Sequence, residues 1–299
     1  MRFFLVGLAL LLSAVTAKAD LDYSRLQHSV YKVYKMNAKG EPHMVASSFA
    51  VNYGNSTYLI TNNHVCFGLA GPGKSYIKVN NGPSENYTNP NDYDEIKQVS
   101  PMPSSDVCVI KTAQQHPGLN FAWSPLTIHQ PVTAFGYIGR SDYIMISHGY
   151  MYGTLDVMDY GGFRDCRAYP PKWVKDRIIC LVSEKYPIFI KNWLQTANVN
   201  VGPGYSGSPV LDANGDIVGI TARYMPPSSI YGNGDGMFYN DSFIIKAIET
   251  ANFVPVTDPK LYEDSKLIDY VSKASEFVED LEDMLMNGIV KYNGEEDSF

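Results

Sequence analysis

The segment Val201–Ile220 reads VGPGYSGSPVLDANGDIVGI and combines closely spaced glycines with two serines. Asn214-Gly215 is a strong signal for a hairpin turn, and it separates the runs SPVLDA and DIVGIT. Ser206 therefore leads into a β-hairpin rather than a helix. The flanking glycines permit a tight backbone that could bring the amides of Gly204 and Ser206 together. Ser206 is either a nucleophile held between glycines or an ordinary turn residue.

The rest of the body also has the character of a β-protein. Short runs rich in Val, Tyr, Phe and Thr recur along it, with Gly, Pro and Asn clusters between them, and neither a βαβ alternation nor a fixed repeat is present. We expect an all-β body in two halves, residues 20–130 and 131–257. The predicted strands are Val30–Met36, Val45–Tyr53, Thr57–Thr61, Asp106–Lys111, Val132–Ile138, Tyr143–Tyr152, Arg177–Glu184, Pro209–Leu211 and Ile217–Tyr224.

The N-terminus has the features of a secretory signal peptide over residues 1–19. Arg2 precedes an apolar run from Phe3 to Val15, and Ala17-Lys18-Ala19 supplies a small-x-small cleavage pattern. The run is shorter than the roughly 20 residues that span a bilayer. We expect a mature chain beginning near Asp20, secreted or periplasmic, with no membrane segment after cleavage.

The acidity of the chain is concentrated in its tail, residues 258–299. This tail holds twelve acidic and four basic residues, whereas the net charge of the whole chain is −7. The body is therefore close to neutral, and it lacks the basic stripe that nucleic-acid binding requires. Apolar residues spaced by four and three predict a helix, which either packs on the body or mediates partner binding or self-association. They are Leu267, Val271, Ala274, Val278, Leu281 and Leu285.

Two other segments could supply the groups that a serine nucleophile needs, a base and a residue to orient it. His64 lies in TYLITNNHVC at the end of a predicted strand, and Asp106 lies in SSDVCVIK at the start of another. Asp92 and Asp94 compete with Asp106, but they lie in the polar run NPNDYDE. An α/β-hydrolase would need a histidine after the serine, and no histidine follows His148.

The four cysteines form an even set in a chain that we expect to be exported. They are Cys66, Cys108, Cys166 and Cys180. In an oxidising compartment such a set favours two disulfides, and three pairings are open. Because no CxxC pair or His/Cys cluster is present, we expect no metal, and the proposed chemistry needs no cofactor.

The three segments together resemble the chymotrypsin-like serine proteases. TYLITNNHVC is similar to their histidine motif, DVCVIK to their aspartate strand and GPGYSGSPVLDANGDIVGI to their nucleophile loop, the last most like bacterial glutamyl endopeptidases and HtrA-type proteases. The resemblance implies two six-stranded antiparallel β-barrels with the site between them. It also implies that His64 is the general base, Asp106 its orienter and Ser206 the nucleophile, with the amides of Gly204 and Ser206 as the oxyanion hole.

The same resemblance suggests a substrate pocket and a cysteine pairing. Asn200 would lie at the pocket base, and Thr221 and Arg223 on its wall, where the glutamate-specific relatives have a histidine in place of Thr221. Tyr205 replaces the aspartate that pairs with a new N-terminus in the pancreatic enzymes, so we expect no activation of that kind.

Cys66 lies two residues after His64, and Cys108 lies two residues after Asp106. If His64 and Asp106 are in contact, a disulfide between Cys66 and Cys108 is favoured, and Cys166 and Cys180 remain as the second pair. The predicted function is a secreted serine endopeptidase acting on proteins or peptides. The alternative is a non-catalytic secreted binding module on the same fold.

Overall fold

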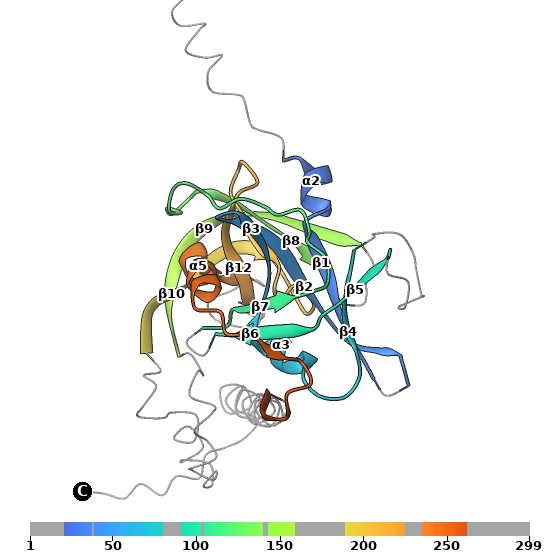
Figure 1. The fold of residues 1–299 in the computed structure, drawn as a ribbon. Helices are drawn as coiled ribbons and strands as arrows, with labels where there is room; N and C mark the ends of the chain where they lie inside the picture. The colour runs from blue at the N-terminus through green and yellow to red at the C-terminus, as the bar shows by residue number, and fades with distance from the viewer. Residues whose placement is uncertain are drawn as a thin grey trace, which may run out of the picture.

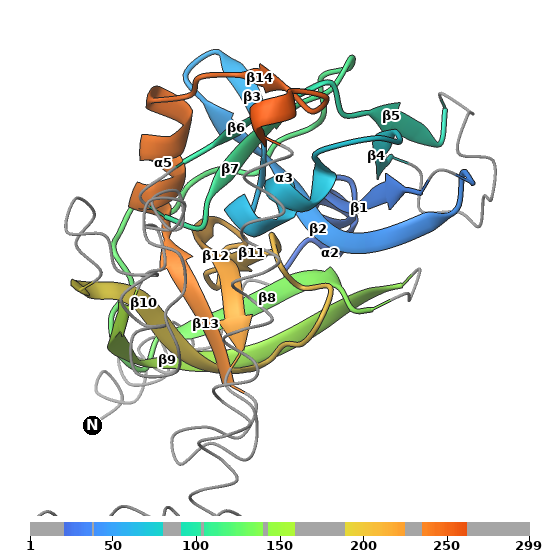
Figure 2. The ribbon, with the colours of Figure 1, turned by 90° about the horizontal axis from the view of Figure 1, so that it is seen from below.

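The computed structural model describes residues 21–37, 39–79, 91–102, 105–139, 143–158, 189–224 and 235–261. These residues do not include the predicted signal peptide, the pair Cys166 and Cys180, the predicted strand Arg177–Glu184 or the predicted tail helix. The regular secondary structure of the described residues is mostly β-strand, arranged in two sheets, which confirms the all-β prediction. Figure 1 shows both sheets, and Figure 2 shows them as two separate layers, blue to teal and green to orange.

The first sheet has eight strands in the order β14-β6-β7-β3-β2-β1-β4-β5, and its edge strand β14 comes from the end of the second half. Its central strands are joined by the hairpin turn at Gly54-Asn55, which sets Tyr53 opposite Ser56. It has more than six strands because two short ones extend its edges. The strands are β1 (Val30–Met36), β2 (Pro42–Tyr53), β3 (Ser56–Thr61), β4 (Ser75–Lys78), β5 (Tyr93–Glu95), β6 (Gln98–Pro101), β7 (Cys108–Lys111) and β14 (Val254–Pro255).

The second half closes into a six-stranded barrel in the order β10-β13-β12-β11-β8-β9. The hairpin predicted at Asn214-Gly215 joins β11 to β12, with Val210 opposite Gly219. Gly215 has φ +81°, a left-handed conformation that glycine adopts without strain. The strands are β8 (Pro131–Tyr137), β9 (Ile144–Met158), β10 (Phe189–Asn200), β11 (Pro209–Leu211), β12 (Ile217–Tyr224) and β13 (Asp235–Asn240).

Within the described residues three helices accompany the sheets, and none of the three was predicted from the sequence. They are α2 (Tyr23–Gln27), α3 (Asn63–Leu69) and α5 (Asp241–Glu249). Asn240 caps the N-terminus of α5, and its side chain accepts the Ser242 N–H at 3.2 Å. Its buried residues, Ile244, Ala247 and Ile248, have helical spacing and belong to the largest core cluster.

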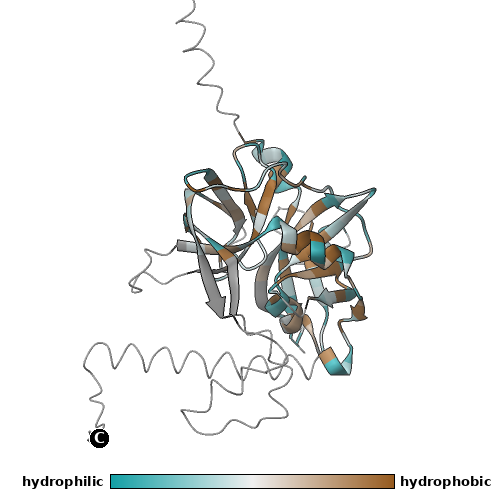
Figure 3. Cartoon of the chain, turned by 90° about the vertical axis from the view of Figure 1, so that its left-hand side faces the viewer, coloured by the Kyte–Doolittle hydropathy of each residue, from teal (hydrophilic) through white to brown (hydrophobic). Residues whose placement is uncertain are grey.

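The largest apolar cluster draws on both halves of the chain. Phe49 and Ile60 come from the first sheet, and Phe135, Ile217 and Tyr239 from the barrel. In Figure 3 the brown, apolar residues recur along the strands, and teal residues gather at turns. Because the halves share this core, their relative position is set by side-chain packing. Among the described residues, no helix is long and apolar enough to cross a membrane.

Candidate active site

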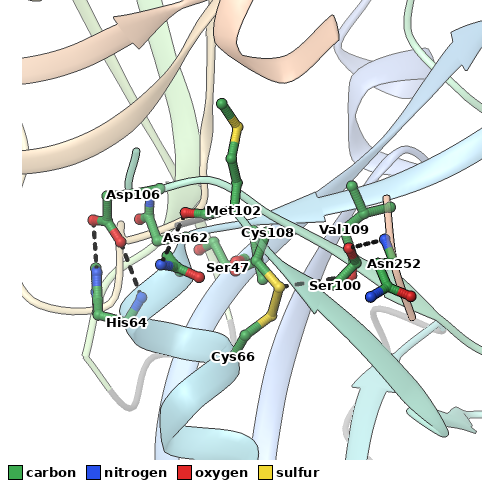
Figure 4. Close-up of a disulfide and its surroundings, with 12 residues drawn as sticks. Ser47, Asn62, His64, Cys66, Ser100, Met102, Asp106, Cys108, Val109 and Asn252 are labelled. Carbon is green, nitrogen blue, oxygen red and sulfur yellow. Dashed lines mark hydrogen bonds and ion pairs between the residues drawn. A yellow bond between two sulfur atoms is a disulfide. The ribbon is translucent and has the colours of Figure 1, made fainter. Parts of the chain in front are cut away.

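The helix α3 places the predicted base beside its predicted orienter. The strand β3 ends at Thr61, and His64 is the second residue of the short helix that follows. The His64 Nδ1 lies 2.8 Å from Asp106 Oδ2, and the His64 backbone N–H donates to Asp106 Oδ1 at 2.9 Å. Figure 4 shows these two contacts. The imidazole side chain is 45% exposed and the carboxylate 13%, so the ring remains open to a reactant.

The two asparagines before His64 attach its segment to the aspartate segment. Asn62 is fully buried, and its Nδ2 donates to the Asp106 backbone carbonyl at 2.8 Å. Asn63 Nδ2 donates to the Met102 carbonyl at 3.2 Å. Sequence reasoning missed both residues. The feature of the sequence that could have identified them is a pair of polar residues between an apolar strand and an apolar turn of a helix.

A disulfide reinforces the same junction. Cys66 and Cys108 are bonded, 42 residues apart in sequence, and both are fully buried. Figure 4 shows the bond linking α3 to β7 beside His64 and Asp106. This is the pairing that the family resemblance favoured. The predicted partner pair, Cys166 and Cys180, lies outside the described residues.

The C-terminal end of α3 is held by a buried lysine. The Lys35 Nζ donates to the carbonyls of Leu69, Gly71 and Gly73 at 2.6, 3.0 and 3.1 Å. The last carbonyls of a helix have no partner within the helix, so a cation at this end satisfies them. Burial lowers the pKa of Lys35 to about 8. Both ends of the helix that carries His64 are thus anchored.

Asp94, the alternative to Asp106 as the orienting residue, is buried although it lies in the polar run NPNDYDE. It lies in β5, only 3% exposed, and its Oδ2 is 3.1 Å from His116 Nε2. It also accepts the N–H groups of Ala113 and Gln114. Burial opposes ionisation, but these hydrogen bonds outweigh it and lower the pKa of Asp94. Asp94 is therefore committed to a buried pair with His116.

Ser206 lies in a tight turn before β11, and its environment is formed by glycines in left-handed conformations. Gly204 has φ +100° and Gly207 has φ +83°. A Cβ on Gly204 would lie 2.5 Å from the Gly139 nitrogen, and one on Gly207 would lie 2.1 Å from the Ser47 carbonyl oxygen. Only glycine fits at either position, because a side chain would meet rigid backbone atoms.

Two carbonyl groups of this turn are held by backbone hydrogen bonds. The Pro203 carbonyl accepts the Gly139 N–H at 2.7 Å, and the Tyr205 carbonyl accepts the Ser208 N–H at 2.8 Å. In a planar trans peptide the C=O and the next N–H point in opposite directions. The N–H groups of Gly204 and Ser206 therefore point away from these partners. Neither has an acceptor among the described residues.

Tyr205 anchors the turn by apolar packing. The residue is 2% exposed and belongs to the cluster inside the second barrel that includes Val132, Val210 and Phe238. Burial raises the pKa of Tyr205 to about 12. An apolar ring thus occupies the position where the pancreatic enzymes have an aspartate. Ser208, the other serine of the turn, is fully buried.

The predicted pocket residues lie on strands next to the turn. Thr221 is buried on β12, its N–H donates to the Ser208 carbonyl at 2.8 Å, and its carbonyl accepts the Gly207 N–H at 3.3 Å. Asn200 is exposed at the end of β10. Arg223 lies on β12, but its side chain is outside the described part of the structure. Among the described residues no hydrogen bond joins His64 to Ser206, and no acidic, His or Cys cluster could hold a metal.

These features agree with a family match that spans all three segments. The model of the trypsin-like peptidase domain matches residues 46–220, more than half of the chain. The chain belongs to the trypsin-like peptidase family. The match includes the positions of His64, Asp106 and Ser206, and it confirms the resemblance predicted from the three motifs. No curated protein sequence matches this trypsin-like peptidase.

Solved protease structures share its fold. The active form of the Rv3671c protease from M. tuberculosis has 18% identity and a TM-score of 0.54, over 77% of this chain and 84% of that one. Deg5 has 14% identity and a TM-score of 0.50, over 75% and 88% of the two chains. The HtrA-type protease AlgW, solved with a decapeptide, has 15% identity and a TM-score of 0.50, over 76% and 65%. At these identities the likeness supports the fold.

Proposed function

We propose that this trypsin-like peptidase is a serine endopeptidase that hydrolyses peptide bonds through an acyl-enzyme. The observation that carries the proposal is the pair formed by His64 and Asp106, held by two hydrogen bonds of 2.8 and 2.9 Å with the imidazole exposed. A buried structural pair would need no such exposure, as the enclosed pair of Asp94 and His116 illustrates. Protein or peptide chains are the substrate class that the family supports.

The hydrogen bond to Asp106 sets the state of the proposed base. When Asp106 accepts a hydrogen bond from the Nδ1–H of His64, the proton stays on Nδ1, and the other ring nitrogen, Nε2, is left as an acceptor. In the proposed reaction Nε2 takes the proton of the Ser206 hydroxyl while the oxygen attacks the scissile carbonyl. Asp106 stays ionised and stabilises the imidazolium that forms, which is the role that the aspartate has in the chymotrypsin-type triad.

The turn around Ser206 supplies the proposed oxyanion donors. The N–H groups of Gly204 and Ser206 have no acceptor among the described residues, and their peptides are held by carbonyl contacts on the opposite side. Donors already aligned for a developing negative charge lower the barrier without reorganising. His64 then protonates the leaving amine, and water attacks the acyl-enzyme by the same steps in reverse.

The proposal includes export. The predicted signal peptide over residues 1–19 and the buried disulfide between Cys66 and Cys108 both fit an oxidising compartment. We therefore propose a secreted or periplasmic enzyme. Intact-mass measurement of protein recovered from the culture medium or the periplasm tests this, and the expected N-terminus lies near Asp20. Recovery only from the cytoplasm, with the leader intact, would contradict it.

The activity is tested by labelling with a fluorophosphonate probe, which reacts with activated serines. Wild type should label, whereas Ser206→Ala and His64→Ala should not. Ser208→Ala is the matched control, because Ser208 lies in the same turn but is fully buried, and this variant should still label. If folded wild type does not label, the endopeptidase proposal fails, and the non-catalytic binding module becomes the better interpretation.

A further inference from the structure

Ser47 on β2 connects the first sheet to the turn that holds Ser206. It is fully buried and lies 157 residues from Gly204 in sequence, so no local pattern marks it. We propose that Ser47 is a positioning residue, and that its hydroxyl holds the proposed oxyanion donors in place. This inference rests on the proposed function, because it assigns a role within the same site.

The contacts of Ser47 use every polar group that it has. Its N–H donates to the Ser206 carbonyl at 2.9 Å, and its hydroxyl donates to the Gly204 carbonyl at 2.8 Å. The hydroxyl oxygen also accepts the Tyr137 N–H at 3.0 Å, and the Ser47 carbonyl accepts the Thr61 hydroxyl at 2.8 Å. One residue of the first sheet therefore holds two carbonyls of the turn and the end of β8.

These two carbonyls flank the peptide group that carries the Ser206 N–H, one of the two proposed oxyanion donors. The Gly204 carbonyl belongs to the peptide before the one that carries the Ser206 N–H, and the Ser206 carbonyl belongs to the peptide after it. Holding both limits the rotation of the peptide between them, because each peptide is a rigid plane. The turn needs such restraint, since glycine tolerates many backbone conformations and Gly204 and Gly207 are both in it.

The surroundings of Ser47 leave no simple replacement for its hydroxyl. A Cβ on Gly136 would lie 3.2 Å from the Ser47 Oγ, and one on Gly207 would lie 2.1 Å from the Ser47 carbonyl oxygen. Without the hydroxyl, the partly buried Gly204 carbonyl and the buried Tyr137 N–H would each lose a hydrogen bond.

The neighbouring residue Ser48 provides a matched control. It is also fully buried on β2, but its hydroxyl has no hydrogen-bond partner among the described residues. Ser48→Ala therefore removes the same atoms from the same strand without removing a contact to the turn. Any difference between Ser47→Ala and Ser48→Ala reports the contacts of the Ser47 hydroxyl.

The test compares hydrolysis of p-nitrophenyl acetate and the rate of fluorophosphonate labelling in wild type and both variants. Ser47→Ala should lower kcat by about 10–100-fold with KM within about threefold, because misaligned oxyanion donors weaken the transition state and not substrate binding. Labelling should slow by a similar factor. The pH dependence of kcat should keep its midpoint, since the base is untouched. Ser48→Ala should stay within about twofold of wild type in both rates.

Each outcome decides a different point. If wild type labels and Ser47→Ala matches Ser48→Ala in kcat, the positioning role is wrong and the proposed function stands. If wild type neither labels nor hydrolyses the ester, the proposed function itself has failed. Should Ser47→Ala not fold, as judged by thermal unfolding, Ser47→Cys replaces it. A thiol is larger than a hydroxyl but branches from the same Cβ and forms weaker hydrogen bonds, so kcat should again fall at constant KM, and an unchanged kcat would overturn the proposal.

Discussion

The disulfide between Cys66 and Cys108 allows stability and active-site geometry to be separated by experiment. The perturbation is Cys66→Ala with Cys108→Ala, which removes the bond and leaves small apolar side chains in a buried apolar cluster. Alanine is preferred to serine because a buried hydroxyl without a partner would add its own cost.

The expected loss of stability follows from the length of the closed loop. With a sequence separation of 42, the chain-entropy relation gives about 4 kcal/mol at 25 °C. For a protein of this size, about 2–4 °C of melting temperature are lost per kcal/mol, so the variant should melt about 8–16 °C lower. Urea unfolding followed by tryptophan fluorescence measures the free energy, and calorimetry measures the melting temperature.

The catalytic geometry should respond much less than stability does. His64 and Asp106 are joined directly by two hydrogen bonds, and Asn62 ties the Asp106 backbone to the same helix. Because a disulfide acts mainly by restricting the unfolded chain, kcat of the folded variant should stay within about threefold of wild type. The assay is p-nitrophenyl acetate hydrolysis at about 10 °C, where the variant is folded.

The single substitutions provide the control. Cys66→Ala and Cys108→Ala each break the same bond, so each alone should lose almost as much stability as the two together. Additive losses would mean that packing of the two side chains, not loop closure, is responsible. A total loss below about 1 kcal/mol would refute the loop-closure argument, and a collapse of kcat in the folded variant would refute the claim that the hydrogen bonds suffice.

Three further predictions concern single residues of the described structure. Asp94→Asn should lower the free energy of unfolding by about 1–3 kcal/mol and leave kcat unchanged. Asp106→Asn should lower kcat by about 10³–10⁴-fold with little effect on urea unfolding. The reverse pattern would mean that Asp94, and not Asp106, orients the base. Gly207→Ala should slow fluorophosphonate labelling at least about tenfold, because its Cβ would lie 2.1 Å from the Ser47 carbonyl oxygen at a φ of +83°, and unchanged labelling would contradict this. Burial raises the pKa of Tyr205 to about 12 from 10.0, so the unfolded chain loses this proton first and the free energy of unfolding should fall between pH 10 and 12. Tyr205→Phe should reduce that fall in alkaline urea titrations, and an equally steep fall would show that Tyr205 does not contribute.

Local patterns of sequence were sufficient where neighbouring residues decide the structure. The strand Ile217–Tyr224 and the turn at Asn214-Gly215 were predicted from alternation and turn chemistry, and both are present. Local patterns did not predict β10, because register shifts around Ala197 interrupt the alternation of side chains that marks a strand. The helix α5 was missed although its cap, Asn240, and its apolar spacing are visible in the sequence.

The sequence by itself determined the family of this protein and the order of His64, Asp106 and Ser206 along it, because short motifs report the local backbone that each residue needs. Only the tertiary structure decided which residues support them. It buried Asp94 against His116, which a polar loop sequence did not suggest. It also brought Ser47 against a turn 157 residues away. Such contacts depend on how two sheets pack through a shared core, and packing between distant segments leaves no period or spacing in either one.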